Sequence, residues 1–149
     1  GEIPKVDSHF DLCLFNTFRS YIDYKNFFPV NHYEFNDLRG SFSELTKSLS
    51  EGQTSYSVTK KGVLRGNHFH TRKIERFSVI KGKAKISIRE LLSEEKIEFL
   101  LDGAKPSYVD IPVWNTHSIE NIGNEDLITI FWINEHYNED YSDTYLENV

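Results

Sequence analysis

Two different spacings of apolar side chains predict one short helix followed by many strands. Near the N-terminus, the apolar residues recur at three- and four-residue steps, which is typical of one helix face: Phe10, Leu14, Phe18, Tyr21 and Ile22. Asp7 or Ser8 is expected to cap this helix, and Asp11 lies favourably in its first turn. Because a lone amphipathic helix is not stable, its apolar stripe needs a cover, which is the chain's own sheet, a partner subunit or an upstream domain.

From residue 35 onward the apolar residues alternate with polar ones, which is the pattern of strands. Short alternating or apolar runs occupy residues 55–59, 75–90, 97–101, 108–111, 117–121 and 127–133. We interpret residues 75–90 as a hairpin that turns at Lys81-Gly82, and residues 127–133 as a strand buried on both faces. Such closely spaced strands predict an all-β sandwich or barrel. We therefore divide the chain into a helix and connector (1–34) and a β domain (35–149), and read the acidic stretch after residue 134 as a surface tail.

Composition excludes several classes of protein. With 149 residues, 38% hydrophobic and 14% aromatic, the chain has the size and core of one folded domain. No apolar run approaches the roughly 20 residues of a membrane span. The single Cys13 excludes a disulfide framework, and the absence of a secretory signal favours the cytoplasm. The chain begins with Gly1 and lacks Met, so we expect it to be a piece of a longer protein.

Charge is distributed unevenly. The net charge of −6 argues against nucleic-acid binding. Residues 59–76, however, carry six cations and one acid, a net charge of +5. This basic segment predicts either a site for a small anion or a solvated basic loop.

The same segment contains candidate metal ligands. His68 and His70 are two residues apart, so on one strand both side chains face the same way, and Glu75 opens the next strand. Imidazoles and a carboxylate that converge in this way suit zinc, iron, manganese or nickel, with His117 as a fourth ligand. The plainer reading makes these ordinary core or surface residues, as we expect for His9, His32 and His136.

The spacing of these residues resembles the two cupin motifs. Five residues match the first motif, G-x5-H-x-H-x4-E-x6-G, at every spacing: Gly62, His68, His70, Glu75 and Gly82. Pro112, His117 and Asn121 resemble the second motif, P-x-G-x2-H-x3-N, but Trp114 replaces its glycine, which predicts a reshaped turn and added bulk near the cavity. The resemblance implies a double-stranded β-helix, or jelly roll.

Longer stretches are similar to the C-terminal cupin domain of the bifunctional capsular-polysaccharide enzymes of CapF or WbjC type. These stretches are residues 3–22, 39–42, 65–70 and 130–149. The resemblance implies a zinc-binding domain that epimerises C3 of a UDP-linked 4-keto-6-deoxy-N-acetylhexosamine, on the way to N-acetyl-L-fucosamine. In such enzymes a short-chain reductase domain precedes the cupin and reduces C4 with NADPH. This chain has no glycine-rich dinucleotide fingerprint, so we expect the reductase as a fused or separate partner.

We assign roles for such a reaction on the same basis. Lys73, between the ligands, is the first candidate for acid or base, and Tyr56 and Tyr108 follow if their strands face the cavity. Arg65, Lys60 and Arg72 are candidates for binding the diphosphate. The alternative for these cations is a solvated loop.

Two further functions remain open at this point. A metal-free nucleotide-sugar epimerase or ketoisomerase would use His68 as a base, since residues 65–68 also resemble the Arg-Gly-x-His segment of those cupins. A non-catalytic cupin would bind a sugar or hold an assembly together. The apolar helix stripe also predicts a homodimer.

Overall fold

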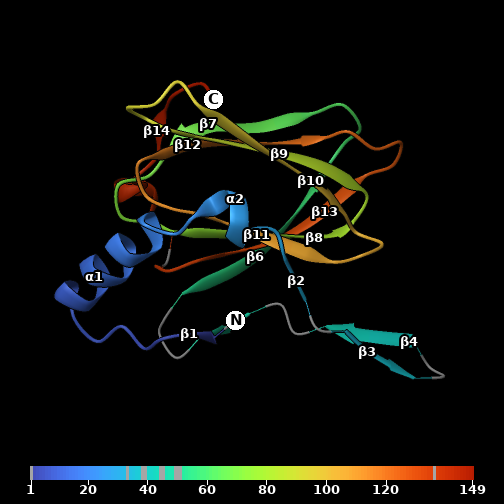
Figure 1. Cartoon of the computed structure of the whole chain (residues 1–149), viewed down its shortest axis with the longest axis horizontal. Coiled ribbons are helices and arrows are strands. Elements are labelled where there is room, and N and C mark those ends of the chain that lie inside the picture. The colour runs from blue at the N-terminus through green and yellow to red at the C-terminus, as the bar shows by residue number, and fades with distance from the viewer. Residues whose placement is uncertain (1, 33, 38–39, 44–45, 49–51, 136) are drawn as a thin grey trace.

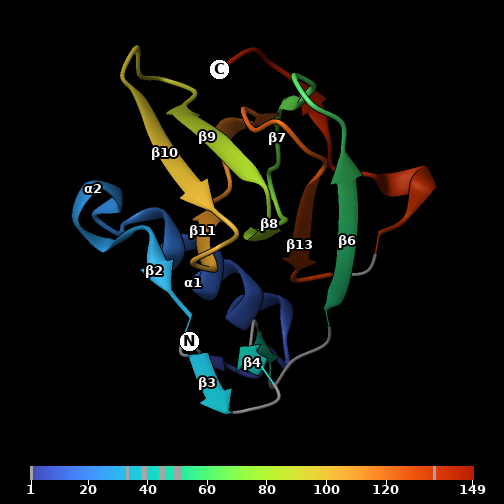
Figure 2. The same ribbon diagram turned by 90° about the vertical axis from the view of Figure 1, so that its right-hand side faces the viewer.

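The computed structural model shows two facing β-sheets with a helix docked at one end (Figures 1 and 2). It describes residues 2–32, 34–37, 40–43, 46–48, 52–135 and 137–149; the predicted ordinary role of His136 and part of the 39–42 resemblance lie outside these residues. None of the described helices is long and apolar enough to cross a membrane.

The described strands form two five-stranded antiparallel sheets, which together make the jelly roll. The first sheet has the order β10 (Lys96–Asp102), β9 (Lys83–Glu90), β12 (Asn115–Asn121), β7 (Leu64–Phe69) and β14 (Tyr145–Leu146). The second has the order β2 (Val30–Asn31), β11 (Ser107–Ile111), β8 (Glu75–Lys81), β13 (Leu127–Ile133) and β6 (Gln53–Thr59). Short two-stranded pairs lie outside them: β1 (Glu2–Ile3) with β5 (Lys47–Ser48), and β3 (Glu34–Asp37) with β4 (Gly40–Ser43).

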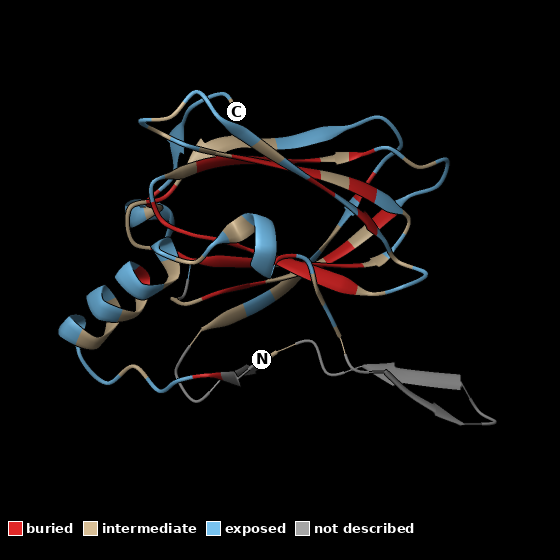
Figure 3. Cartoon of the chain, in the orientation of Figure 1, coloured by how far each residue is buried: buried red, intermediate tan, exposed pale blue. Residues whose placement is uncertain are grey.

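The core lies between the sheets because alternate side chains of each strand point inward. Its buried members come from both sheets: Val79, Ala84, Ile86, Ile88, Phe99, Leu101, Val109, Ile111, Ile119 and Leu127. Figure 3 shows this buried material along the facing surfaces of the barrel. Strand β13 has no exposed residue, as its continuous apolar run predicted.

Strands β8 and β9 correct the predicted hairpin at residues 75–90. They belong to different sheets, and the chain passes from one sheet to the other at Gly82, which has φ +83°. A hairpin and a crossing from one sheet to the other both show alternating apolar residues and a glycine at the turn. The sequence pattern therefore could not distinguish them. The hairpin is formed instead by β9 and β10.

Helix α1 (His9–Ser20) has the predicted cap but docks through an unexpected face. Ser8 Oγ accepts a hydrogen bond from the Asp11 N–H at 3.1 Å. The face turned to the barrel carries Asn16, which is buried and donates to the Arg72 carbonyl at 2.7 Å. Most of the apolar stripe faces outward, with Phe10 72% and Phe18 65% exposed, so within this chain it is uncovered except at Ile22, which packs against the core.

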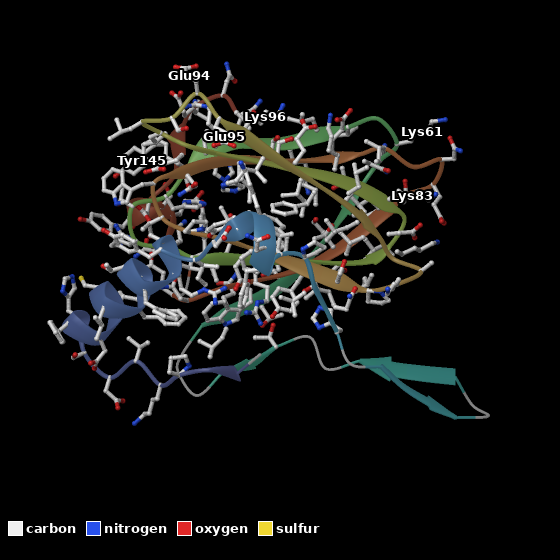
Figure 4. The ribbon with its side chains drawn as sticks, in the orientation of Figure 1. Lys61, Lys83, Glu94, Glu95, Lys96 and Tyr145 are labelled. Atoms are coloured by element: carbon white, nitrogen blue, oxygen red, sulfur yellow. The ribbon has the colours of Figure 1, made fainter. Side chains whose placement is uncertain are left out.

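A second helix and the C-terminal segment pack around the two sheets, and the C-terminal segment includes the strand that carries Tyr145 (Figure 4). Helix α2 (Tyr24–Phe27) follows α1, and its neighbour Phe28 enters the core. The C-terminal segment, with the 3-10 turn η1 (Glu139–Tyr141) and strand β14, pairs with β7. The prediction of a plain surface tail is therefore wrong at Asp143, which is 5% exposed. The predicted boundary between residues 34 and 35 stays a prediction.

Candidate metal centre

Four side chains from three segments converge inside the barrel. His68 lies near the end of β7 and His70 just beyond it, while Glu75 begins β8 and His117 lies on β12 opposite His68. One potential ligand atom from each of the four lies within 4.8 Å of the other three. The sequence spacing thus brings together the four residues that it singled out.

Two atoms that face each other in this group, His70 Nε2 and Glu75 Oε2, are suited to accept rather than donate. His70 Nδ1 lies 2.5 Å from the carbonyl oxygen of Asp143, and because a carbonyl only accepts, Nδ1 carries the proton. Its Nε2 is then a lone pair, 3.3 Å from Glu75 Oε2, and His117 Nε2 lies 2.9 Å from the same oxygen. All three atoms are buried without a hydrogen-bond partner among the described residues. Buried acceptor atoms that face one another are stable only if the rings carry protons or a cation lies between them. The residues present therefore fit a metal ion.

The charge states agree with this fit. Burial, together with the nearby ring of His117, lowers the pKa of His68 to about 4, so this ring is neutral near pH 7 and has a lone pair to offer. Burial alone would raise the pKa of Glu75, but its contacts with His117 and His70 outweigh burial and hold the pKa well below its ordinary value. The centre therefore contains a neutral imidazole, that of His68, and an ionised carboxylate, that of Glu75.

Backbone features bring β7 and β12 close together at this centre. Gly66 has φ +106°, and a Cβ atom there would lie 2.6 Å from the His117 carbonyl oxygen. The register of the two strands shifts at His117, which is a bulge. At this bulge the two strands that carry His68 and His117 approach so closely that only glycine fits at position 66.

Trp114 keeps the turn that the second motif normally forms with glycine. Its φ of +61° lies in the left-handed region, and its N–H donates to the His70 carbonyl at 2.8 Å. Its ring stacks on Phe69, which in turn stacks on Tyr145. Because Phe69 follows inward-facing His68 on the strand, this stack lies outside the barrel. The left-handed φ gives no sign of a reshaped turn. Trp114 does add bulk near a cavity, as predicted, because it lines a cleft at the end of the barrel near α2, although its ring does not face the four clustered side chains.

A cleft of about 830 Å³ opens beside the centre, at the end of the barrel near α2. It lies between the α1–α2 turn and the β9–β10 hairpin, and Ile88 and Asn115 are among the residues that line it. Ile88 is the register partner of His117, although none of the four clustered side chains lines the cleft itself. The cleft thus reaches the strand position that is paired with His117.

Comparison with known proteins places the chain in a family. Residues 35–145 match the family described as polysaccharide biosynthesis C-terminal domain. The chain belongs to this family. A protein of Pseudomonas aeruginosa named UDP-2-acetamido-2,6-beta-L-arabino-hexul-4-ose reductase is 36% identical over 135 residues, which cover 87% of this chain and 36% of that protein.

Solved structures related to this polysaccharide biosynthesis C-terminal domain agree. The capsular polysaccharide assembling protein CapF from Staphylococcus aureus is 40% identical, with a TM-score of 0.66, and the match covers 99% of this chain and 40% of CapF. The dTDP-4-dehydrorhamnose 3,5-epimerase of Sulfolobus tokodaii is 24% identical, with a TM-score of 0.65 over 75% of this chain and 72% of the epimerase, and shares the fold. The predicted cupin jelly roll and the resemblance to CapF-type C-terminal domains are confirmed. The chain spans about two fifths of the length of these CapF relatives.

Within this family domain, neither of the two predicted tyrosines faces the centre, whereas Lys73 lies in the loop that joins His70 to Glu75. Tyr56 is 72% exposed on the outer face of β6, because its neighbours Ser55 and Ser57 occupy the inner face. Tyr108 lies on the outer face of β11, where the Arg76 guanidinium stacks over its ring at 4.0 Å. Lys73 is buried, and its ammonium donates to the Ser142 carbonyl. The alternation of residues along a strand predicts which side chains share a face, but it does not predict which face points into the barrel.

The predicted basic segment of the domain divides into two groups. Arg72 forms a 2.9 Å ion pair with Glu135 and covers the ring of Tyr141, so it anchors the C-terminal segment. Arg65 and Lys60 are exposed, and neither has an ion-pair or hydrogen-bonding partner through its side chain among the residues that the structure describes. Arg65 is opposite Ile119, a core residue, and therefore lies on the inner face at the opening of the barrel.

A buried charge cluster next to the centre was missed by the sequence analysis. Asp110 accepts hydrogen bonds from Arg76 at 2.6 and 2.9 Å and forms an ion pair with Arg19 of helix α1. All three side chains are largely buried. Arg76 directly follows Glu75 but points to the other face of β8, where it connects the sheet to the helix. Neither the helical nor the strand spacing indicates this cluster, because its members come from a helix and two strands that are distant in the sequence.

Proposed function

We propose that this domain epimerises C3 of a UDP-linked 4-keto-6-deoxy-N-acetylhexosamine in the biosynthesis of an N-acetyl-L-fucosamine-type sugar for bacterial capsule or O-antigen. The observation that carries the proposal is the convergence of three imidazoles and one carboxylate inside a jelly roll. Membership of the polysaccharide biosynthesis family supports it. The Pseudomonas relative supports the substrate class, because its name describes a UDP-linked acetamido sugar with a ketone at C4.

The four clustered residues hold a divalent ion in this proposal, and we assign zinc. Imidazole nitrogens with a single carboxylate are a donor set that zinc prefers. Bound there, the ion would act as a Lewis acid toward the substrate ketone, which makes the neighbouring C3 proton more acidic. The His70 Nδ1 contact to the Asp143 carbonyl holds the ring so that Nε2 faces the centre.

Residues at the opening of the barrel bind the nucleotide in this proposal. Arg65 lies on the inner face, and Lys60 lies in the turn that precedes β7, where the Val63 N–H donates to its carbonyl. Both are exposed cations that can pair with a diphosphate, Arg65 in the two-pronged mode. The cleft of about 830 Å³ has the size of a small-molecule site and offers room for the sugar.

The reduction of C4 belongs to a reductase domain or chain, fused or separate. The sequence has no dinucleotide fingerprint, and the relatives that it matches are more than twice its length. We also propose a homodimer built on the outward apolar stripe of α1. A cytoplasmic location stays a prediction.

A metal-free epimerase is the second candidate, with His68 as the base. The observation that favours it is burial: His68 is the one histidine of the four residues that is not fully buried. Its lowered pKa of about 4 keeps it unprotonated near pH 7. In this reading Glu75, His70 and His117 only shape the pocket.

Deuterium exchange separates the two candidates. The purified chain is incubated with the UDP-linked ketosugar in deuterium oxide, without nicotinamide, and deuterium at C3 is measured by NMR. We expect exchange in the zinc-loaded chain, none after chelation, and recovery when zinc is restored. Exchange that persists in chelated protein with no metal by elemental analysis supports the metal-free enzyme.

Two variants complete the experiment. His70→Ala should lose zinc and exchange together, because an open zinc site rarely survives the loss of a buried ligand. His9→Ala, an exposed histidine on helix α1, is the matched control and should keep both. If the zinc-loaded chain exchanges no deuterium, the enzymatic proposal fails and a sugar-binding or assembling cupin takes its place.

A further inference from the structure

Asp143 in the C-terminal segment binds the loop between two of the clustered residues. Its side-chain oxygens accept hydrogen bonds from three consecutive backbone N–H groups, at 3.1 Å from Thr71, 2.8 Å from Arg72 and 3.1 Å from Lys73. The Thr71 hydroxyl adds a fourth at 2.6 Å. Successive N–H groups that surround a carboxylate form an anion-binding nest. The nest therefore fixes the loop that joins His70 to Glu75.

The backbone of Asp143 acts on His70 directly. Its carbonyl oxygen lies 2.5 Å from His70 Nδ1, which fixes both the tautomer and the direction of the ring. The Asp143 side chain is fully buried, and its φ of +48° lies in the left-handed region, which is uncommon outside glycine. The carboxylate and the carbonyl of one residue thus hold the loop and the ring together.

Neighbouring contacts keep the C-terminal segment in this place. The Lys73 ammonium donates to the Ser142 carbonyl, and Thr116 Oγ1 donates to the Glu147 carbonyl at 2.5 Å. The Glu147 N–H donates to the Asn67 carbonyl at 3.0 Å, beside His68. Each of these contacts lies within two residues of a clustered histidine or Glu75. The segment is therefore joined to β7, to β12 and to the loop that leads from His70 to Glu75.

We propose that Asp143 is a positioning residue for the metal centre: its carboxylate, bound in the nest of residues 71–73, places its carbonyl so that His70 presents Nε2 to the ion. The proposal rests on the proposed function for the ion, but the placement of the ring is independent of metal. Asp143 lies 73 residues from His70 and in neither cupin motif, so sequence spacing does not indicate it.

The test measures the tautomer of His70 in the metal-free chain by long-range proton–nitrogen NMR. The wild-type chain should carry the ring proton on Nδ1. Asp143→Ala should lose this single tautomer and exchange between both forms, and Thr71→Val, which removes one hydroxyl donor, should give a smaller shift in the same direction. Asp140→Asn removes the same charge from the same segment at an exposed position and should match the wild type.

Zinc affinity, measured by competition with a chelator, is the second readout. Loss of a group that orients a ligand typically weakens metal binding about 10–100-fold, which we expect for Asp143→Ala. Circular dichroism shows whether each variant is folded. If Asp143→Ala does not fold, the tautomer and zinc affinity of Thr71→Val test the proposal instead.

The outcomes distinguish this proposal from the proposed function. An unchanged tautomer and unchanged zinc affinity in folded Asp143→Ala would overturn it, as would a wild-type His70 that carries its proton on Nε2. A tautomer that depends on Asp143 in a chain that binds no zinc would support the positioning role and reject the metal centre.

Discussion

Gly66 is the point at which a single added methyl group should disturb the centre. It lies on β7 two residues before His68, and its Cα faces the backbone of β12 at His117 and Ser118. A Cβ atom would lie 2.6 Å from the His117 carbonyl oxygen and 2.8 Å from the Ser118 Cα. Both contacts are with backbone, which cannot rotate away as a flexible side chain could.

The size of the effect follows from these distances. Contacts of this kind become ordinary at 3.4 Å, so Gly66→Ala must part the strands by about 0.8 Å, whereas metal–ligand distances tolerate about 0.2 Å. We expect zinc affinity to fall at least about tenfold. Backbone strain at positive φ costs about 1–2 kcal/mol, and overpacking adds about 1–3 kcal/mol to the loss of unfolding free energy.

Gly62→Ala is the matched control because it separates strain from contact. Gly62 also has a positive φ, of +71°, but a Cβ atom there would meet nothing within 4 Å. Urea denaturation and zinc competition on both variants should show the strain alone for Gly62→Ala and the larger combined effect for Gly66→Ala. Equal losses of stability and equal zinc affinities would refute the reasoning that the close approach of β7 and β12 places the histidines.

Four other substitutions test separate parts of the structure. Asp110→Ala removes the carboxylate between two buried guanidinium groups and should cost about 3–5 kcal/mol in urea denaturation, against little change for exposed Asp126→Ala. Arg65→Ala should raise KM for the proposed UDP-sugar about 10–100-fold with kcat nearly unchanged, because it removes the charged hydrogen bonds to the diphosphate that we propose for this residue; a fall in kcat alone contradicts this. Tyr56→Phe should leave deuterium exchange at C3 at the wild-type rate, since the ring points to solvent. Phe18→Asp should convert the proposed dimer to a monomer in light scattering, and a wild-type chain that is already monomeric at micromolar concentration rejects that interface.

The sequence predicted those features that depend on local spacing. Ser8 caps α1 as expected. The clustered residues come from two short motifs: their strands β7 and β12 pair in the first sheet, and β8 lies in the facing sheet. Spacing of this kind is fixed by strand geometry, in which every second side chain shares a face. Trp114 shows that even a changed motif residue can keep the backbone of its turn.

Features that depend on distant neighbours could not be predicted in this way. Tyr56 and Ser57 are adjacent on β6, and only the position of the facing first sheet decides which of them is inside. Asn16 is the buried residue of α1 because a carbonyl of the 71–74 loop lies beside it, and nothing in the helical period indicates that carbonyl. Asp143 is buried for the same reason, since its partners come from a loop early in the barrel.

The reversed docking of helix α1 also has a thermodynamic consequence. Burial of apolar surface is what gives unfolding its large heat capacity, and this contribution weakens on cooling. Within this chain the helix is attached mainly by the hydrogen bond from Asn16 and the ion pair of Arg19. Its docked face buries only part of Phe15, and most of the apolar stripe lies in water. Release of the helix from the barrel should therefore carry little heat capacity and respond to temperature almost linearly, whereas unfolding of the barrel follows a curved stability profile.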